Sequence, residues 1–247
     1  MNAIDRHARP TPGYNDRVAA ALGRLADAAT AHAGRIVQAT SLGAEDMVLT
    51  DLIARHRLPI ALATLDTGRL HPETLALADA TERHYGVTIE RFAPPAEAAL
   101  HFVREHGELA MRQSVALRKA CCALRKLEPL GRLLTGRTAW VTGLRREQSD
   151  ARAEVSFGDI DDAGRAKLNP LADWSQADVW HYIAQHGVPY NVLHDRFFPS
   201  IGCEPCTRAV ALGEDFRAGR WWWEQEDAKE CGLHVSHPPQ HTAKETA

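Results

Sequence analysis

Apolar residues follow two different periods along the chain. Four short apolar runs have the length of buried strands: residues 35–40, 59–67, 87–92 and 138–144. Between these runs, apolar residues recur every three or four positions, as they do on the buried face of a helix. Strands that alternate with helices predict an α/β fold in which a parallel sheet is flanked by helices.

Helix boundaries can be placed where the sequence carries start and stop signals. The apolar spacing of residues 47–53 indicates a helix directly behind the first strand. Pro72 suits a first helical turn and Gly86 the end of that helix. Ser175 is a plausible N-cap for a helix that closes at Gly187. Beyond residue 202 the sequence is polar and predicts loops.

Length and composition agree with a single domain. The chain has 247 residues, 45% of them hydrophobic and 25% charged, which is ordinary for a globular protein with one large core. We expect a single domain over 1–247, with an N-terminal arm (1–14), a core (15–206) and a C-terminal segment (207–247). The net charge of −3 predicts no general affinity for nucleic acid.

The opening residues 1–14 lack the apolar run of a signal peptide, and no later stretch is long and uncharged enough to span a bilayer. We therefore expect a cytoplasmic protein without a membrane partner.

Because cytosolic disulfides are uncommon, the five cysteines need another explanation. They form a tandem pair, a CxxC pair and one remainder: Cys121, Cys122, Cys203, Cys206 and Cys231. The two pairs predict a metal site with four thiolate ligands, and Cys231 is left over.

Three loops that contain glycine follow predicted strands, at residues 40–46, 65–71 and 142–152. The carboxyl ends of parallel strands meet at one edge of a sheet, where ligands of such sheets bind. The first loop leads directly into a helix, whose N-terminus can receive an anion. Any one of these loops alone could be an ordinary turn, but three at one edge indicate a binding site.

Eight segments together resemble the assimilatory adenylyl-sulfate reductases. In order along the chain they are TSLGAED, LDTGRLHPET, CC followed by RKLEPL, TGLRREQS, NPLADW, IGCEPC, GRWWWE and KECGLH. The resemblance spans about residues 40–234, and the combination of CC, CxxC and ECGLH is its most specific part. It implies an adenine nucleotide alpha-hydrolase-like fold and the reduction of adenosine 5′-phosphosulfate to sulfite and AMP, with thioredoxin or a glutaredoxin as electron donor.

The first loop differs from the Ser-Gly-Gly-x-Asp-Ser sequence of related pyrophosphatases. Ala44 replaces a glycine, Met47 replaces the closing serine, and Glu45 adds a charge that we expect to repel a triphosphate. An ATP-cleaving role is therefore disfavoured, whereas a phosphosulfate could rest against Ser41 and Gly43. The other substrate contacts that we expect in the loops are Leu65, Gly68 and Gly143.

The spacing of Cys121, Cys122, Cys203 and Cys206 leaves zinc and an iron–sulfur cluster as alternatives. Adjacent cysteines strain a small zinc tetrahedron, which favours the larger cluster. The resemblance implies one [4Fe–4S] cluster per chain.

Several basic residues have a substrate-binding role by resemblance. Lys126 follows the cysteine pair in a stretch of helical character, and Arg217 and Arg220 are spaced to share a helix face. Their charges suit phosphate and sulfate oxygens. The resemblance also favours Arg152 as a contact. The alternative is that Arg145, Arg146 and Arg152 lie in an exposed turn that is salt-bridged with Glu147 and Asp150. Trp221, Trp222 and Trp223 either stack on adenine or, as we prefer, pack this segment and aim its arginines.

Cys231 is the predicted nucleophile. A reactive thiolate needs access and nearby positive charge, which Lys229 and His234 supply in sequence. We expect Cys231 to attack the sulfate sulfur and form an S-sulfocysteine, with His234 binding substrate. Thioredoxin then releases sulfite. A mobile C-terminal segment would suit both steps, because it must close over substrate and later present its sulfur to a protein.

Other functions remain open at this point. A 3′-phosphoadenylyl-sulfate reductase, or an enzyme that uses both nucleotides, is the nearest alternative. A cluster-bearing tRNA-thiolating enzyme would need an ATP loop and a basic surface, and a zinc-binding module would have no use for three strand-end loops. The sequence does not determine whether the chain forms a homo-oligomer.

Overall fold

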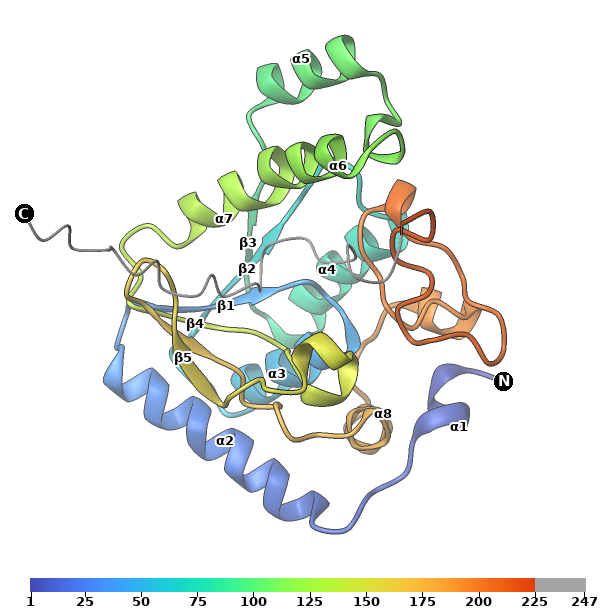
Figure 1. Cartoon of the computed structure of the whole chain (residues 1–247). Helices are drawn as coiled ribbons and strands as arrows, with labels where there is room; N and C mark the ends of the chain where they lie inside the picture. Colours follow the sequence, from blue (N-terminus) through green and yellow to red (C-terminus); the bar gives the residue numbers. More distant parts are fainter. Residues whose placement is uncertain (225–247) are drawn as a thin grey trace, which may run out of the picture.

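The architecture is an α/β layer structure, given by a computed structural model that describes residues 1–224 (Figure 1). The helices are α1 (Ala3–His7), α2 (Tyr14–Ala31), α3 (Ala44–Arg55), α4 (Pro72–Tyr85), α5 (Ala96–His106), α6 (Val115–Cys122), α7 (Glu128–Leu133) and α8 (Gln176–His186). The strands are β1 (Ile36–Thr40), β2 (Ala61–Leu65), β3 (Ile89–Phe92), β4 (Ala139–Val141), β5 (Gly158–Ile160) and β6 (Ala166–Leu168). Short helical turns cover Ala110–Arg112, Arg146–Gln148, Asp150–Arg152, Val192–Arg196 and Glu204–Cys206, and a π-turn covers Ala123–Leu127.

The six strands form one sheet in the order β3-β2-β1-β4-β6-β5. All neighbours pair in parallel except β5, which is antiparallel to β6. The predicted parallel sheet is therefore confirmed over its first four strands. The hairpin of β5 and β6 was missed, because residues 158–168 are polar and carry no apolar period.

Both faces of the sheet are covered, as Figure 1 shows. One core joins the sheet to α2, α3, α4 and α8 through residues such as Leu25, Met47 and Ile183. A smaller core on the opposite face packs Leu133 of α7 against Val37 and Trp140. Because both faces are apolar, the central strands read as continuous apolar runs in the sequence.

The expected helix ends are confirmed. Ser175 caps α8 by accepting a hydrogen bond from Asp178 N, and Gly86 and Gly187 end α4 and α8 in the left-handed conformation. The N-terminal arm is tied to α8, since Thr11 N and Arg17 both donate to the buried carboxylate of Asp178. No helix among residues 1–224 is long and apolar enough to span a membrane.

Candidate active site

A cleft of about 210 Å³ opens at the carboxyl ends of β1, β2 and β4. The sheet order reverses here, because β2 and β3 lie on one side of β1 and β4 lies on the other. Ligands of open parallel sheets bind at such a reversal. Most of the expected substrate contacts line this cleft: Ser41, Gly43, Leu65, Lys126, Gly143, Arg152, Arg217 and Arg220. Their contact with substrate stays a prediction.

Three of the expected site residues are placed elsewhere or not described. Gly68 does not line the cleft; its φ of +66° shapes the turn after β2, and an added Cβ would lie 3.4 Å from Arg125 Nη1. Cys231 and His234 fall outside the described residues. The described part of the site therefore holds most of the predicted binding residues, whereas the predicted nucleophile lies outside the described residues.

The loop after β1 is held by Asp46. Its Oδ2 accepts hydrogen bonds from both the backbone N and the Oγ of Ser41, each at 2.6 Å. Leu42 has a φ of 60°, a left-handed conformation that is unfavourable for a residue with a Cβ. Burial raises the pKa of Asp46 to about 6, although the bonds from Ser41 lower it in part. The loop is thus fixed before any ligand binds, and Gly43 begins α3 at the cleft.

Glu45 is not a free charge in the cleft. Its Oε1 accepts hydrogen bonds from Arg145 Nη2 at 2.8 Å and from Gln148 Nε2 at 3.0 Å. Burial alone would raise the pKa of Glu45, but these partners outweigh it and the pKa is lowered. The expected repulsion of an anionic tail by Glu45 is therefore largely cancelled by Arg145.

The loop after β4 is organised by Gln148, which the sequence did not single out. Gln148 Nε2 donates to Gly143 O at 3.2 Å, and its Oε1 accepts from Arg152 Nη1 at 2.7 Å. Arg145 is only 2% exposed and also pairs with Glu147. The alternative of an exposed turn is wrong for Arg145, because that side chain is buried, but the pairing with Glu147 that this alternative included is confirmed.

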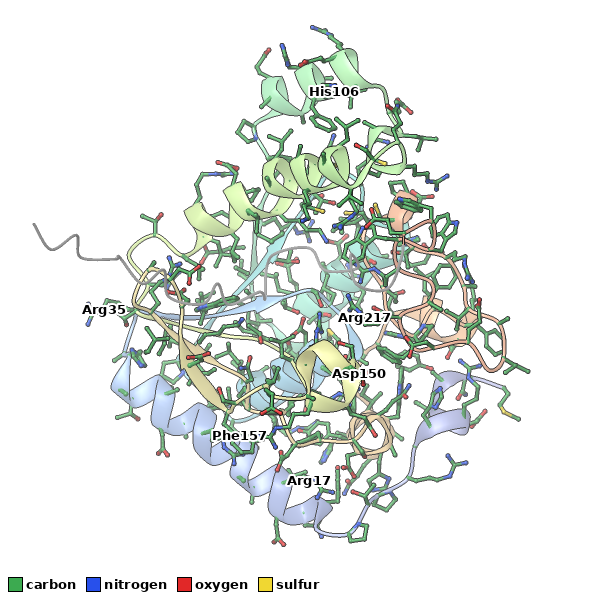
Figure 2. All side chains as sticks on the ribbon, in the orientation of Figure 1. Arg17, Arg35, His106, Asp150, Phe157 and Arg217 are labelled. Atoms are coloured by element: carbon green, nitrogen blue, oxygen red, sulfur yellow. The ribbon has the colours of Figure 1, made fainter. Side chains whose placement is uncertain are left out.

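The opposite wall of the cleft is cationic. Lys126 lies on the π-turn between α6 and α7, a local widening of the helix that often marks functional sites. Arg217 lies in a turn and Arg220 forms an isolated bridge with Thr207, so neither is on a helix, and both are 7% exposed. Figure 2 shows Arg217 between the sheet and the C-terminal part of the described chain. The expected cations therefore meet in space, although the arginines do so without the predicted helix face.

Close packing fixes Arg220. A Cβ added to Gly202 would lie 2.5 Å from Arg220 Nη2, so any other residue here would require the guanidinium to shift from this position. Arg220 Nη1 donates to Ser200 Oγ at 3.2 Å, and its Cζ lies 4.7 Å from the centre of the Trp221 ring. Trp221 is 1% exposed, which agrees with the packing role preferred for it.

The four paired cysteines line one small cavity between α6 and residues 203–206. All four are buried and none forms a disulfide. Burial and the neighbouring thiols Cys203 and Cys122 raise the pKa of Cys206 to about 12. Within residues 1–224, no group of three or more His, Cys, Asp or Glu side chains is placed to hold a metal ion.

The cysteine cavity and the cleft share a wall. Lys126, Arg220 and Trp221 line both spaces. A second link passes through Thr67, whose Oγ1 lies 3.3 Å from Cys203 Sγ and whose carbonyl accepts from Arg125 Nη1 at 2.8 Å. Neither Thr67 nor Arg125 was identified from the sequence, since their partners are distant along the chain.

His194 lies behind the cleft and is 5% exposed. Burial lowers its pKa to about 4, so the imidazole is neutral at pH 7. The side chain of His194 therefore packs behind the cleft as an uncharged group.

The sheet order and the cleft at its reversal define an adenine nucleotide alpha-hydrolase-like domain. Two solved structures share the fold. A phosphoadenylyl-sulfate reductase from Candida auris, in complex with phosphate, has a TM-score of 0.65 at 26% identity over 84% of this chain and 96% of that one. An FMN adenylyltransferase from Candida glabrata has a TM-score of 0.54 at 14% identity over 88% of this chain and 75% of that one, which supports the fold alone.

Residues 35–209 match the phosphoadenosine phosphosulfate reductase domain, and the chain belongs to that family. A relative from Allochromatium vinosum is 60% identical over 200 residues, which cover 81% of this chain and 78% of the relative. One from Burkholderia cepacia is 56% identical over 199 residues, covering 80% of each. Both relatives are named adenosine 5′-phosphosulfate reductase. The family resemblance found in the sequence is thereby confirmed.

Proposed function

We propose that the protein reduces adenosine 5′-phosphosulfate to sulfite and AMP in assimilatory sulfate reduction. The observation that carries this proposal is the cationic wall of Lys126 and Arg220, which separates the nucleotide cleft from a cavity lined by four cysteines. The names of the relatives from Allochromatium vinosum and Burkholderia cepacia support the same substrate.

The cleft supplies the groups that the first half-reaction needs. Lys126, Arg217 and Arg220 would bind the phosphosulfate oxygens, because guanidinium and ammonium groups make charge-assisted hydrogen bonds to them. The Cys231 thiolate attacks the sulfate sulfur, a new S–S bond forms and the bond from sulfur to the phosphate oxygen breaks. AMP leaves with that electron pair, and the same cations stabilise the charge that grows on its phosphate.

The second half-reaction needs an external dithiol, for which we propose reduced thioredoxin. Its thiolate attacks Cys231 Sγ, sulfite leaves with the S–S bonding electrons, and a mixed disulfide forms. The second thiol of the donor then resolves this disulfide and regenerates the Cys231 thiolate. The donor is oxidised by two electrons and sulfur is reduced by two.

We further propose that Cys121, Cys122, Cys203 and Cys206 hold a [4Fe–4S] cluster. The donors suit it, since four buried thiols line one cavity and cations such as Arg118 and Lys126 line the same cavity and would offset thiolate charge. The adjacent Cys121 and Cys122 also suit a cubane better than one zinc ion, because a cubane can bind each sulfur through its own iron. When bound, the cluster would cross-link α6 to residues 203–206 and place its charge beside Lys126.

Turnover without and with a reductant tests the reaction. Purified protein mixed with adenosine 5′-phosphosulfate should release at most one AMP per site and no sulfite, and should carry one SO₃ group on Cys231. Reduced thioredoxin should then release sulfite. A Cys231→Ser variant should lose the AMP burst and keep its iron. A full burst in that variant would show that another residue attacks sulfur.

Metal analysis and substrate comparison test the remaining parts. Anaerobically purified protein should contain iron and acid-labile sulfide in equal amounts; active protein with stoichiometric zinc would contradict the cluster. Turnover of the 3′-phosphorylated nucleotide, measured in the same preparation, decides whether the protein uses both substrates. Binding of ATP or tRNA would favour a thiolating enzyme instead.

A further inference from the structure

A buried ion pair holds the last described turn of the chain against α6. Arg118 Nε donates to Glu224 Oε1 at 2.6 Å, although the two residues are 106 positions apart. Their side chains are 0% and 4% exposed. Burying two charges is unfavourable unless they are well paired, so each residue depends on the other in this position.

The turn itself has an unusual backbone. Trp221 has a φ of 42°, in the left-handed region that residues with a Cβ avoid. Its indole contacts two guanidinium groups, with Arg118 Cζ at 4.6 Å and Arg220 Cζ at 4.7 Å from the ring centre. A backbone conformation of this kind persists only where the surrounding contacts hold it. Arg118 makes two of these contacts, one to the ring of Trp221 and one to Glu224.

Arg118 also belongs to the wall of the cysteine cavity. It precedes Cys121 and Cys122 by three and four residues on α6, so all three side chains share one helix face. The helix that carries one cysteine pair therefore also fixes the direction in which the chain leaves Trp221.

Glu224 lies seven positions before Cys231. We propose that Arg118 and Glu224 are a positioning pair, which aims the chain from Trp221 to Glu224 so that the Cys231 thiol is delivered to the cleft. This inference rests on the proposed role of Cys231. Arg118 and Glu224 act through the backbone that leads to the thiol and touch neither substrate nor the reacting sulfur.

The tether is the chain between the last fixed residue and Cys231. Its length shows how large a rate loss must be before it indicates that the Arg118–Glu224 pair orients the chain and does not merely shorten it. Without Glu224, the nearest fixed backbone is Trp221, whose N donates to Cys206 O at 3.2 Å, and the tether to Cys231 grows from seven to ten residues. For a flexible chain this lowers the frequency of end contact only about twofold. Loss of orientation at a reacting centre has much larger effects, of about a hundredfold for small misplacements. A loss beyond tenfold would therefore show that direction matters.

The test uses the full-length, iron-loaded protein and the variants Glu224→Ala and Glu224→Gln. We expect Glu224→Ala to slow AMP release in the first turnover more than tenfold, with the Kd for AMP and the iron content unchanged. Glu224→Gln keeps the shape and the hydrogen-bond acceptor, so we expect a smaller loss; it serves as the test if the alanine variant does not fold. Glu128→Ala, which removes the exposed pair with Arg132 on α7, is the matched control and should be neutral.

A first-turnover rate within twofold of the wild type would overturn the proposal. So would a loss of AMP affinity in proportion to the rate, because Glu224 would then shape the cleft. Loss of iron would show that the pair serves the cysteine site only.

A second measurement does not depend on turnover. Trypsin should cleave after the buried Arg220 much faster in Glu224→Ala than in the wild type or in Glu128→Ala, and equal rates would refute the anchor. If the wild type cleaves no adenosine 5′-phosphosulfate, the proposed function fails, while the trypsin result still decides whether Arg118 and Glu224 fix this turn.

Discussion

Gly202 offers a sharp test of the cationic wall, because its effect should pass entirely through Arg220. The Cβ of an alanine at this position would lie 2.5 Å from Nη2 and 2.7 Å from Cζ of Arg220. Contacts below 3 Å between such atoms do not persist, so the guanidinium must move. Trp221 also packs against the guanidinium, with its ring centre 4.7 Å from Cζ, so a shift of the guanidinium must disturb this contact as well.

The expected magnitude follows from the contact that is lost. One charge-assisted hydrogen bond contributes about 1.5–3 kcal/mol, so kcat/KM for adenosine 5′-phosphosulfate should fall by about 10- to 150-fold in Gly202→Ala. Steady-state kinetics with reduced thioredoxin measures this directly. Iron content must be measured in the same sample, since Cys203 is the next residue.

A double-mutant cycle separates this reasoning from general damage. If Gly202 acts only by leaving room for Arg220, adding Gly202→Ala to Arg220→Ala should cause no further loss. Gly131→Ala on α7 is the matched control, because an added Cβ there meets nothing within 4 Å and helical alanine is favoured over glycine. Unchanged kinetics in Gly202→Ala, or additive losses in the double variant, would refute the proposed role of this packing.

Three further predictions concern single residues. Lys126→Ala should lower kcat/KM by about 10- to 150-fold at normal iron content, whereas the exposed Lys119 on α6 should tolerate alanine; equal kinetics would remove Lys126 from the site. Asp51→Ala should lower the free energy of unfolding by about 3–5 kcal/mol in urea titrations, because this fully buried carboxylate accepts from Tyr182 and Arg55; a loss below 1 kcal/mol would contradict it. The pKa of Asp46 is raised to about 6, so Asp46 binds a proton more tightly in the folded than in the unfolded protein. Lowering the pH from 7 to 5 should therefore raise the free energy of unfolding through this group by about 1 kcal/mol. Denaturant titrations at both pH values should show that Asp46→Asn removes this gain.

The sequence predicted the central strands and helix ends because these depend on local signals. Apolar runs, Ser175 and Gly187 need no distant partner to be recognised. The hairpin of β5 and β6 needs one, since its polar residues pair at the edge of a sheet formed by other parts of the chain. Arg217 and Arg220 were also assigned to a helix wrongly, because their conformation depends on parts of the chain that are distant in sequence.

Residues that hold the site in place were the hardest to predict. Arg118 and Gln148 look like ordinary polar residues of a helix and a loop, and nothing near them in sequence reveals their partners. Arg118 meets Glu224 and Gln148 meets Glu45 only after the chain has folded. The residues expected to contact substrate could be inferred from a motif, whereas their supports required the structure.

The charge of the cleft depends more on which charged side chains pair locally than on the net charge of the chain. A chain with a net charge of −3 gains a site for an anion only if its local acids are neutralised. Arg145 does this for Glu45, the one residue of the first loop from which we expected repulsion. Arg145 is buried and pairs with Glu45, while Lys126, Arg217 and Arg220 line the cleft. What disfavours a triphosphate here is then less the charge of Glu45 than the shape of the loop, in which Ala44 stands where a pyrophosphatase has glycine.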